Sequence, residues 1–129
     1  MNHFVKLLPL ATGIVLATAA WAAGPPAGNA AAGQVVFKQQ CAACHAVTPN
    51  AGPGVGPRLF GVVNRRAGAV PGYAYSPAMK ASGLTWNARQ LRLFLDNPAK
   101  TVKGNKMPYA GLHDPAKLDN VIAYLATLK

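Results

Sequence analysis

The sequence predicts an all-α domain in which three main helices, short helical turns and long loops wrap around one bound group. Three segments carry apolar residues at helical spacing, and each is preceded by a residue that caps helices well. Long loops rich in glycine and proline join them, and such loops in a compact domain normally have a functional reason. The sequence contains neither an internal repeat nor a clear strand pattern.

The first helix is predicted over residues 30–40, with Asn29 as its cap. Gly33 and Phe37 share its apolar face. Glycine inside a helix costs about 1 kcal/mol relative to alanine. Gly33 therefore predicts the close passage of another element, with a merely tolerated glycine as the alternative.

A short helix is predicted to open at Ser76 and Pro77 and to end at Gly83. The second main helix follows, capped by Asn87 and closed before Pro98, because the residue before proline avoids the α region. Its predicted apolar face is formed by Ala88, Leu91, Phe94 and Leu95.

Residues 46–57, after the first helix and the turn that follows it, are a loop by composition, and residues 98–112 are predicted to form a second long loop. The last helix is predicted to begin with Asp114 as cap and Pro115 as its first residue. Its apolar stripe consists of Leu118, Val121, Ile122, Leu125 and Leu128.

A Cys-x-x-Cys-His motif at residues 41–45 is the attachment signature of a c-type haem. Two thiols at this spacing reach the two vinyl groups on one edge of a porphyrin and form thioethers. The next residue, His45, is then held under the ring, where its imidazole can bind the iron. The motif predicts one covalent haem c on Cys41 and Cys44.

Three other interpretations of the two cysteines are weaker. A redox dithiol calls for a βαβ context, which the sequence lacks. A zinc site would have to recruit His113, since the chain has two cysteines and His3 lies in a leader segment. A disulfide across two residues would stabilise little.

Residues 1–22 resemble a secretory signal peptide, with Lys6, an apolar run, and a small-x-small cleavage site before Ala23. An uncleaved membrane anchor is the alternative, but the run is short and is interrupted by Pro9 and Gly13. The expected mature domain is 23–129, exported to the periplasm.

The chain is strongly basic, with 13 Lys and Arg against three acidic residues and a formal net charge of +10. Only Lys6 lies in the leader, so the mature domain stays basic. This charge favours acidic protein partners. Nucleic acid is disfavoured, because the basic residues are not interleaved with the aromatic residues that single-strand binders need.

Taken together, these motifs resemble the class I c-type cytochromes, in particular bacterial relatives of mitochondrial cytochrome c. Gly33-x-x-x-Phe37 and Val121-x-x-Tyr124 are similar to the family's crossing terminal helices, and Lys106-Met107-x-x-Ala110-Gly111 resembles its distal ligand loop. The resemblance implies the small cytochrome c fold around one haem, and a monomer.

The resemblance also implies roles for individual residues. Met107 would be the second iron ligand, with Met79 as its rival, and the Pro57 carbonyl would accept the imidazole N–H of His45. Residues expected to satisfy the haem propionates are Arg65, Tyr75 and Trp86, and Trp86 also suits plain core packing. Lys100, Lys103 and Lys106 flank Met107 and are expected to dock partners.

The predicted function is that of a soluble one-electron carrier in a respiratory or photosynthetic chain. The resemblance implies a cytochrome bc complex or a dehydrogenase as donor, and an oxidase, reaction centre or peroxidase as acceptor. The alternatives are a haem subunit of a dehydrogenase, and a haem peroxidase or gas sensor, which would need an open iron position. Filled axial positions argue against an enzyme.

Overall fold

The computed structural model describes residues 28–129, so the predicted signal peptide, residues 1–22, lies outside the described residues. Three main helices are present: α1 (Ala30–Gln40), α3 (Ala88–Asp96) and α5 (Pro115–Leu125). Two short helices, α2 (Pro77–Ala81) and α4 (Pro98–Thr101), lie between them. Residues 28–129 contain no strand, and their one β-bridge joins Arg66 to Thr85. The predicted all-α class is confirmed.

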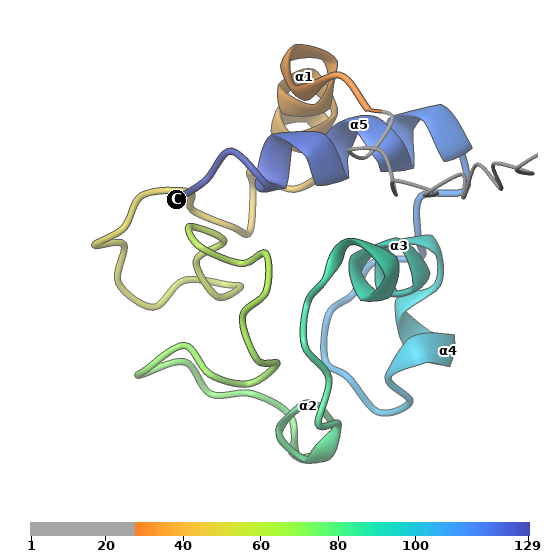
Figure 1. Cartoon of the computed structure of the whole chain (residues 1–129). Helices are drawn as coiled ribbons and strands as arrows, with labels where there is room; N and C mark the ends of the chain where they lie inside the picture. Colours follow the sequence, from red (N-terminus) through yellow and green to blue (C-terminus); the bar gives the residue numbers. More distant parts are fainter. Residues whose placement is uncertain (1–27) are drawn as a thin grey trace, which may run out of the picture.

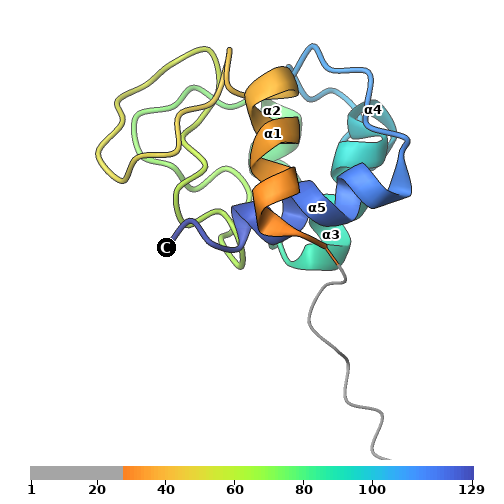
Figure 2. The ribbon, with the colours of Figure 1, turned by 90° about the horizontal axis from the view of Figure 1, so that it is seen from above.

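Helices α1 and α5 cross closely, with α1 lying over α5 (Figures 1 and 2). Gly33 lies at the crossing, where a Cβ atom would come within 1.8 Å of the Asn120 carbonyl oxygen. The close passage predicted from Gly33 is therefore confirmed. Beside the crossing, the rings of Phe37 and Tyr124 pack with centroids 5.4 Å apart, an arrangement that aromatic pairs favour.

The helix starts follow the predicted caps. Asn29, Ser76, Asn87 and Asp114 each accept a hydrogen bond from a backbone N–H in the first turn of the helix they precede. Such caps depend on neighbouring residues, which is why the starts are predictable from the sequence.

The structure departs from the sequence prediction at residues 98–101, which form α4 instead of loop. Asn97 directly follows α3, and its backbone N–H donates to the Leu93 carbonyl. Its side chain accepts a hydrogen bond from the backbone N–H of Lys100 at 3.0 Å, and Pro98 is the first residue of the new helix. Proline is well suited to that position, because its missing N–H is unsatisfied there in any case. Pro98 is also fully buried, so packing fixes this turn.

Two smaller expectations were wrong. Helix α5 ends at Leu125, so Leu128 lies beyond it and is half-buried. Ala88, predicted on the apolar face of α3, is exposed, while Leu91 and Phe94 are buried. The first turn of α3 projects past the core.

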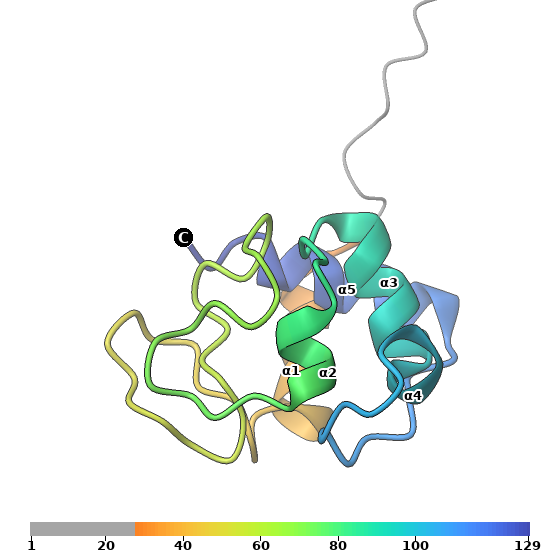
Figure 3. The same cartoon turned by 90° about the horizontal axis from the view of Figure 1, so that it is seen from below.

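The long loops complete a ring of chain below the α1–α5 crossing. Residues 41–75, coloured yellow to green, run down one side; α2 closes the bottom; α3, α4 and residues 102–112 occupy the other side (Figures 1 and 3). Among the described helices, none is both long enough and apolar enough to cross a membrane. The ring encloses the cavity described next.

Candidate haem site

A cavity of about 430 Å³ lies inside this ring. Its lining is mainly apolar, with side chains from α1, α2, α3 and α5 and from both long loops. The volume is in the range of pockets that hold small molecules and cofactors. The core side chains therefore surround a cavity instead of filling the centre of the domain.

The Cys-x-x-Cys-His motif forms a turn directly after α1. The backbone N–H of Cys41 donates to the Phe37 carbonyl at 2.8 Å, which continues the helix, and those of Cys44 and His45 donate to the Cys41 carbonyl at 3.1 and 3.0 Å. Cys41, Cys44 and His45 all line the cavity. Burial, with a smaller contribution from Cys44, raises the pKa of Cys41 to about 11. Before a thioether forms, this sulfur is a neutral thiol.

The His45 ring is held by the backbone of the following loop. Its Nδ1 lies 2.7 Å from the Pro57 carbonyl oxygen, which can only accept, so Nδ1 carries the proton. That leaves Nε2 as the lone-pair nitrogen of the ring. The ring also packs on Gly56, where a Cβ atom would come within 2.5 Å of His45 Cε1.

The environment of His45 keeps its imidazole neutral. Burial lowers its pKa, the hydrogen bond to Pro57 opposes that shift, and the charge of Arg65 adds a further lowering. A neutral imidazole is the form that binds a metal. Both the tautomer and the charge state suit a metal ligand.

Met107 lines the cavity from the loop after α4. This loop lies on the side of the ring opposite residues 41–57 (Figures 1 and 3). Asn105 organises this loop, since its Oδ1 accepts from the Met107 N–H at 2.9 Å and its Nδ2 donates to the carbonyls of Pro98 and Val102, each at 2.9 Å. Met79 also lines the cavity, but from α2 at the bottom of the ring. The two methionines thus approach from different sides.

Arg65, Tyr75 and Trp86 also line the cavity. The Arg65 guanidinium donates to the carbonyls of Phe60 at 3.0 Å and Arg58 at 2.9 Å, and burial lowers its pKa. The Tyr75 hydroxyl accepts from the Val70 N–H at 3.1 Å. Trp86 is buried against Phe94, with ring centroids 4.9 Å apart. Trp86 therefore packs in the core as well as facing the cavity.

The three candidate docking lysines differ in their surroundings. Lys100 and Lys103 are exposed, on α4 and just after it. Lys106 donates from Nζ to the Ala74 carbonyl, and its Nζ lies 4.6 Å from the centre of the Tyr73 ring. Lys106 thus joins the Met107 loop to residues 73–74 across the cavity, a contact that the sequence does not predict.

The site also contains Gln40, Asn105 and Tyr109, which the sequence motifs do not indicate. The Tyr109 hydroxyl donates to Gln40 Oε1 at 2.5 Å, and burial, with a smaller effect of Cys41, raises the Tyr109 pKa. Asn105 carried a local signal, because asparagine often bonds the backbone two residues on. Gln40 and Tyr109 are 69 residues apart and carried none.

The zinc interpretation finds no support in the part of the chain that the structure describes. No group of three or more His, Cys, Asp or Glu side chains that could hold a metal ion occurs within residues 28–129. His113 Nδ1 lies 3.3 Å from Asp96 Oδ1 at the protein surface, and His113 does not line the cavity. These side chains suit a haem instead. Two cysteine thiols and a neutral imidazole lie on one wall of the cavity, methionine side chains lie on other walls, and the rest of the lining is mainly apolar.

The cytochrome c family model matches residues 30–129. Cytochrome c2 of Rhodomicrobium vannielii is 46% identical over 123 residues, covering 95% of this chain and 94% of that protein. Cytochrome c2 of Rhodoblastus acidophilus is 50% identical over 103 residues, covering 80% of this chain and 95% of that protein. The solved structure of cytochrome cH from Methylobacterium extorquens superposes with a TM-score of 0.72 at 50% identity, covering 78% of this chain and 99% of that one.

Proposed function

This chain belongs to the cytochrome c family and is an electron-transfer protein, not an enzyme, with one covalently bound haem c; we propose that it shuttles single electrons between membrane redox complexes. The observation that carries the proposal is the neutral, anchored His45 ring in a cavity whose opposite side bears Met107. His45 and Met107 would hold the iron of a bound haem from opposite walls of the cavity, which would leave no vacant position for a substrate. The haem supplies the one-electron chemistry, and the protein supplies binding, orientation and electrostatics.

In this proposal Cys41 and Cys44 form the two thioethers and His45 is the first axial ligand. The Pro57 carbonyl holds the His45 ring in one tautomer and orientation, as second-shell partners of ligating histidines generally do. Met107 would be the second ligand, and its thioether would raise the reduction potential relative to a His/His pair. Met107 is favoured over Met79 because its loop lies across the cavity from the loop of His45.

Arg65, Tyr75 and Trp86 are proposed to face the haem propionates. Buried carboxylates need a compensating charge and hydrogen-bond donors. Two backbone carbonyls fix the Arg65 guanidinium at the cavity wall, so its positive charge is held in place. Trp86 can contribute its indole N–H while its ring packs on Phe94.

We propose that residues 1–22 export the chain and are removed, leaving a monomeric domain 23–129 in the periplasm. The pattern of Lys6, an apolar run and a small-x-small site before Ala23 supports this. The covalent haem also supports export, because c-type attachment takes place outside the bacterial cytoplasm.

The proposed partners are acidic redox proteins of a respiratory or photosynthetic chain. A cytochrome bc complex or dehydrogenase would be the donor, and an oxidase, reaction centre or peroxidase the acceptor. Lys100 and Lys103 support acidic partners, because both are exposed in the segment leading to Met107. Lys106 would add charge at the same edge, although its amine is bonded to Ala74.

Reduction of the purified ferric protein by membranes of the source organism tests this function. If the bc complex is the donor, quinol should drive reduction and a bc inhibitor should abolish it. If a dehydrogenase is the donor, its substrate should drive reduction in the presence of the inhibitor. The ferric spectrum should contain the weak far-red band that marks methionine ligation in this family. A missing band together with turnover of peroxide would indicate a peroxidase or sensor. A stable complex with a dehydrogenase that alone reduces the protein would indicate a haem subunit.

A further inference from the structure

The loop that carries Met107 is tied to the rest of the molecule at several points. Before Met107, Asn105 bonds the loop to the carbonyls of Pro98 and Val102, and Lys106 bonds it to Ala74. At its far end, the Leu112 N–H donates to the Leu95 carbonyl at 2.8 Å. Between these ties, Pro108 and Tyr109 line the cavity, and the loop reaches α1 through Tyr109.

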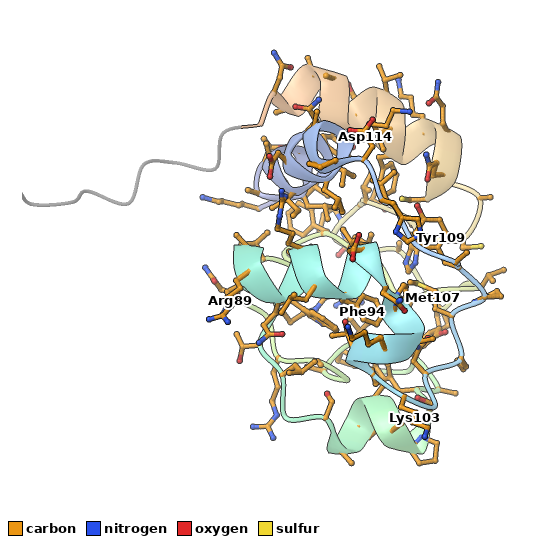
Figure 4. The ribbon with its side chains drawn as sticks, turned by 90° about the vertical axis from the view of Figure 1, so that its right-hand side faces the viewer. Arg89, Phe94, Lys103, Met107, Tyr109 and Asp114 are labelled. Atoms are coloured by element: carbon orange, nitrogen blue, oxygen red, sulfur yellow. The ribbon has the colours of Figure 1, made fainter. Side chains whose placement is uncertain are left out.

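Tyr109 spans from the loop to the last residue of α1. Its ring is half-buried against the core and lines the cavity, and its hydroxyl donates to Gln40 Oε1 at 2.5 Å. Gln40 directly precedes Cys41. Figure 4 shows Tyr109 and Met107 next to each other along one edge of the molecule.

Helix α1 is a firm support for this contact. Gly33 lets α1 cross α5 in close contact, and the Phe37 and Tyr124 rings pack beside the crossing. A side chain bonded to the end of α1 is therefore bonded to the most tightly packed pair of helices in the fold.

A short turn transmits the position of Tyr109 to Met107. The Tyr109 N–H donates to the Met107 carbonyl at 2.9 Å, the bond of a three-residue turn, and Pro108 is its central residue. Proline fixes its own φ angle, so this turn has little freedom. A displacement of the Tyr109 ring therefore displaces Met107.

We propose that the hydrogen bond between the Tyr109 hydroxyl and the Gln40 side chain is a clasp that holds the Met107 loop closed over the cavity. Tyr109 is then a positioning residue for Met107, acting through Pro108. The inference rests on the proposed role of Met107 as an iron ligand. The clasp would set how often Met107 dissociates from the iron, and hence how readily a small molecule could bind there.

The expected size of the effect follows from the exposure of the bond. The clasp lies at the surface, where water competes for both groups, so its loss should change the opening equilibrium about three- to tenfold. Because α1 and α5 pack without it, the change should be local to residues 107–111.

Stopped-flow mixing of the ferric holoprotein with imidazole measures loop opening, since imidazole can bind only after the methionine leaves. We expect Tyr109→Phe and Gln40→Ala each to raise the observed binding rate about three- to tenfold. Their double variant should be no faster than the faster single one, because both remove the same bond. Gln40→Glu keeps an acceptor and should stay near the wild-type rate.

Tyr124→Phe is the matched control, because it removes a tyrosine hydroxyl on α5 from a residue that does not line the cavity. It should bind imidazole at the wild-type rate. Amide hydrogen exchange should quicken at residues 107–111 in Tyr109→Phe and stay unchanged in α1 and α5. A general loss of packing would instead quicken exchange throughout.

Three results would overturn the clasp, and they differ in what else they overturn. Wild-type imidazole rates in both Tyr109→Phe and Gln40→Ala would refute the clasp alone, provided that Met107→Ala opens the iron. If Met107→Ala itself kept the far-red band and the wild-type imidazole rate, Met107 would not be the ligand, and both the proposed ligation and the clasp would fail. Additive effects of the two single variants would also refute a shared bond.

Discussion

The two loops that face each other across the cavity are held in different ways. On the His45 side, backbone hydrogen bonds hold the loop in place. The Gly56 N–H donates to the Cys44 carbonyl and the Leu59 N–H to the Ala46 carbonyl, both at 2.8 Å. On the Met107 side, the side chains of Asn105, Lys106 and Tyr109 make most of the ties, and one backbone bond, from the Leu112 N–H to the Leu95 carbonyl, adds to them.

Because of this difference, we expect the two loops to differ in how easily they open. Backbone bonds and two thioethers next to His45 make that side hard to open and insensitive to most side-chain changes. Side-chain bonds are each worth about 0.5–1.5 kcal/mol net, so the Met107 side can open locally while the rest stays folded. Variants that change one loop at a time test this expected difference.

Removal of both thioethers should have the largest effect. In a Cys41→Ser, Cys44→Ser variant the covalent haem is lost and the cavity of about 430 Å³ has no occupant. At about 24 cal/mol per Å³, such a cavity costs on the order of 10 kcal/mol, comparable with the whole stability of a small domain. Circular dichroism should show a largely unfolded chain. Cooperative melting of the haem-free variant would contradict this expectation.

Loss of the Met107 thioether should leave the haem attached but open one side. Met107→Ala should lose the far-red band, lower the reduction potential, and bind cyanide or carbon monoxide without a loop-opening step. Met79→Leu is the control, because the rival methionine lines the same cavity from α2. If Met79→Leu lost the band and Met107→Ala kept it, the assignment of the ligand would be reversed.

A single methyl group should distinguish tight packing beside His45 from ordinary packing nearby. Gly56→Ala places a Cβ atom 2.5 Å from the His45 ring, which must then shift, and we expect a loss of about 1–3 kcal/mol in unfolding free energy. Gly54→Ala meets its nearest neighbour, the Gly56 carbonyl oxygen, at 3.6 Å, an ordinary contact. Denaturant unfolding of the two holoproteins measures the difference. Equal denaturation midpoints for the two variants would show that the loop around Gly56 can shift at little cost in free energy.

Surface charge beside the Met107 loop should have the smallest effect, on rate alone. Lys100→Glu, Lys103→Glu should slow electron transfer to an acidic partner severalfold at low salt and flatten its dependence on ionic strength. Spectrum and potential should stay unchanged. Arg89→Glu is the matched control, since Arg89 is exposed at the opposite edge of the face shown in Figure 4.

Stopped-flow rates across a salt series measure these slopes. Coinciding slopes for the lysine variant and the wild type would mean that docking occurs elsewhere. Lys106 is left out of this variant because its amine is bonded to the Ala74 carbonyl, and its loss would disturb the loop as well as the charge.

Much of the fold was predictable from the sequence because its signals are local. A capping side chain bonds a backbone N–H three residues away, so Asn29, Asn87 and Asp114 mark helix starts without knowledge of the rest of the chain. The haem motif is likewise local, because two thiols and an imidazole must meet one porphyrin within five residues. Gly33 is an intermediate case: the sequence indicates a close passage, and the structure identifies Asn120 as the neighbour.

Only the tertiary structure decided how the Met107 side is closed. Gln40 meets Tyr109 across 69 residues, and Lys106 meets the Ala74 carbonyl across 32. Such contacts depend on how separate segments are placed, and a glutamine or a lysine in those positions looks like any surface residue. The sequence by itself determined the helices, the attachment motif and the charge, because each depends on neighbours along the chain. How the Met107 loop is tied down depends on bonds between distant segments, so it could be inferred only from the fold.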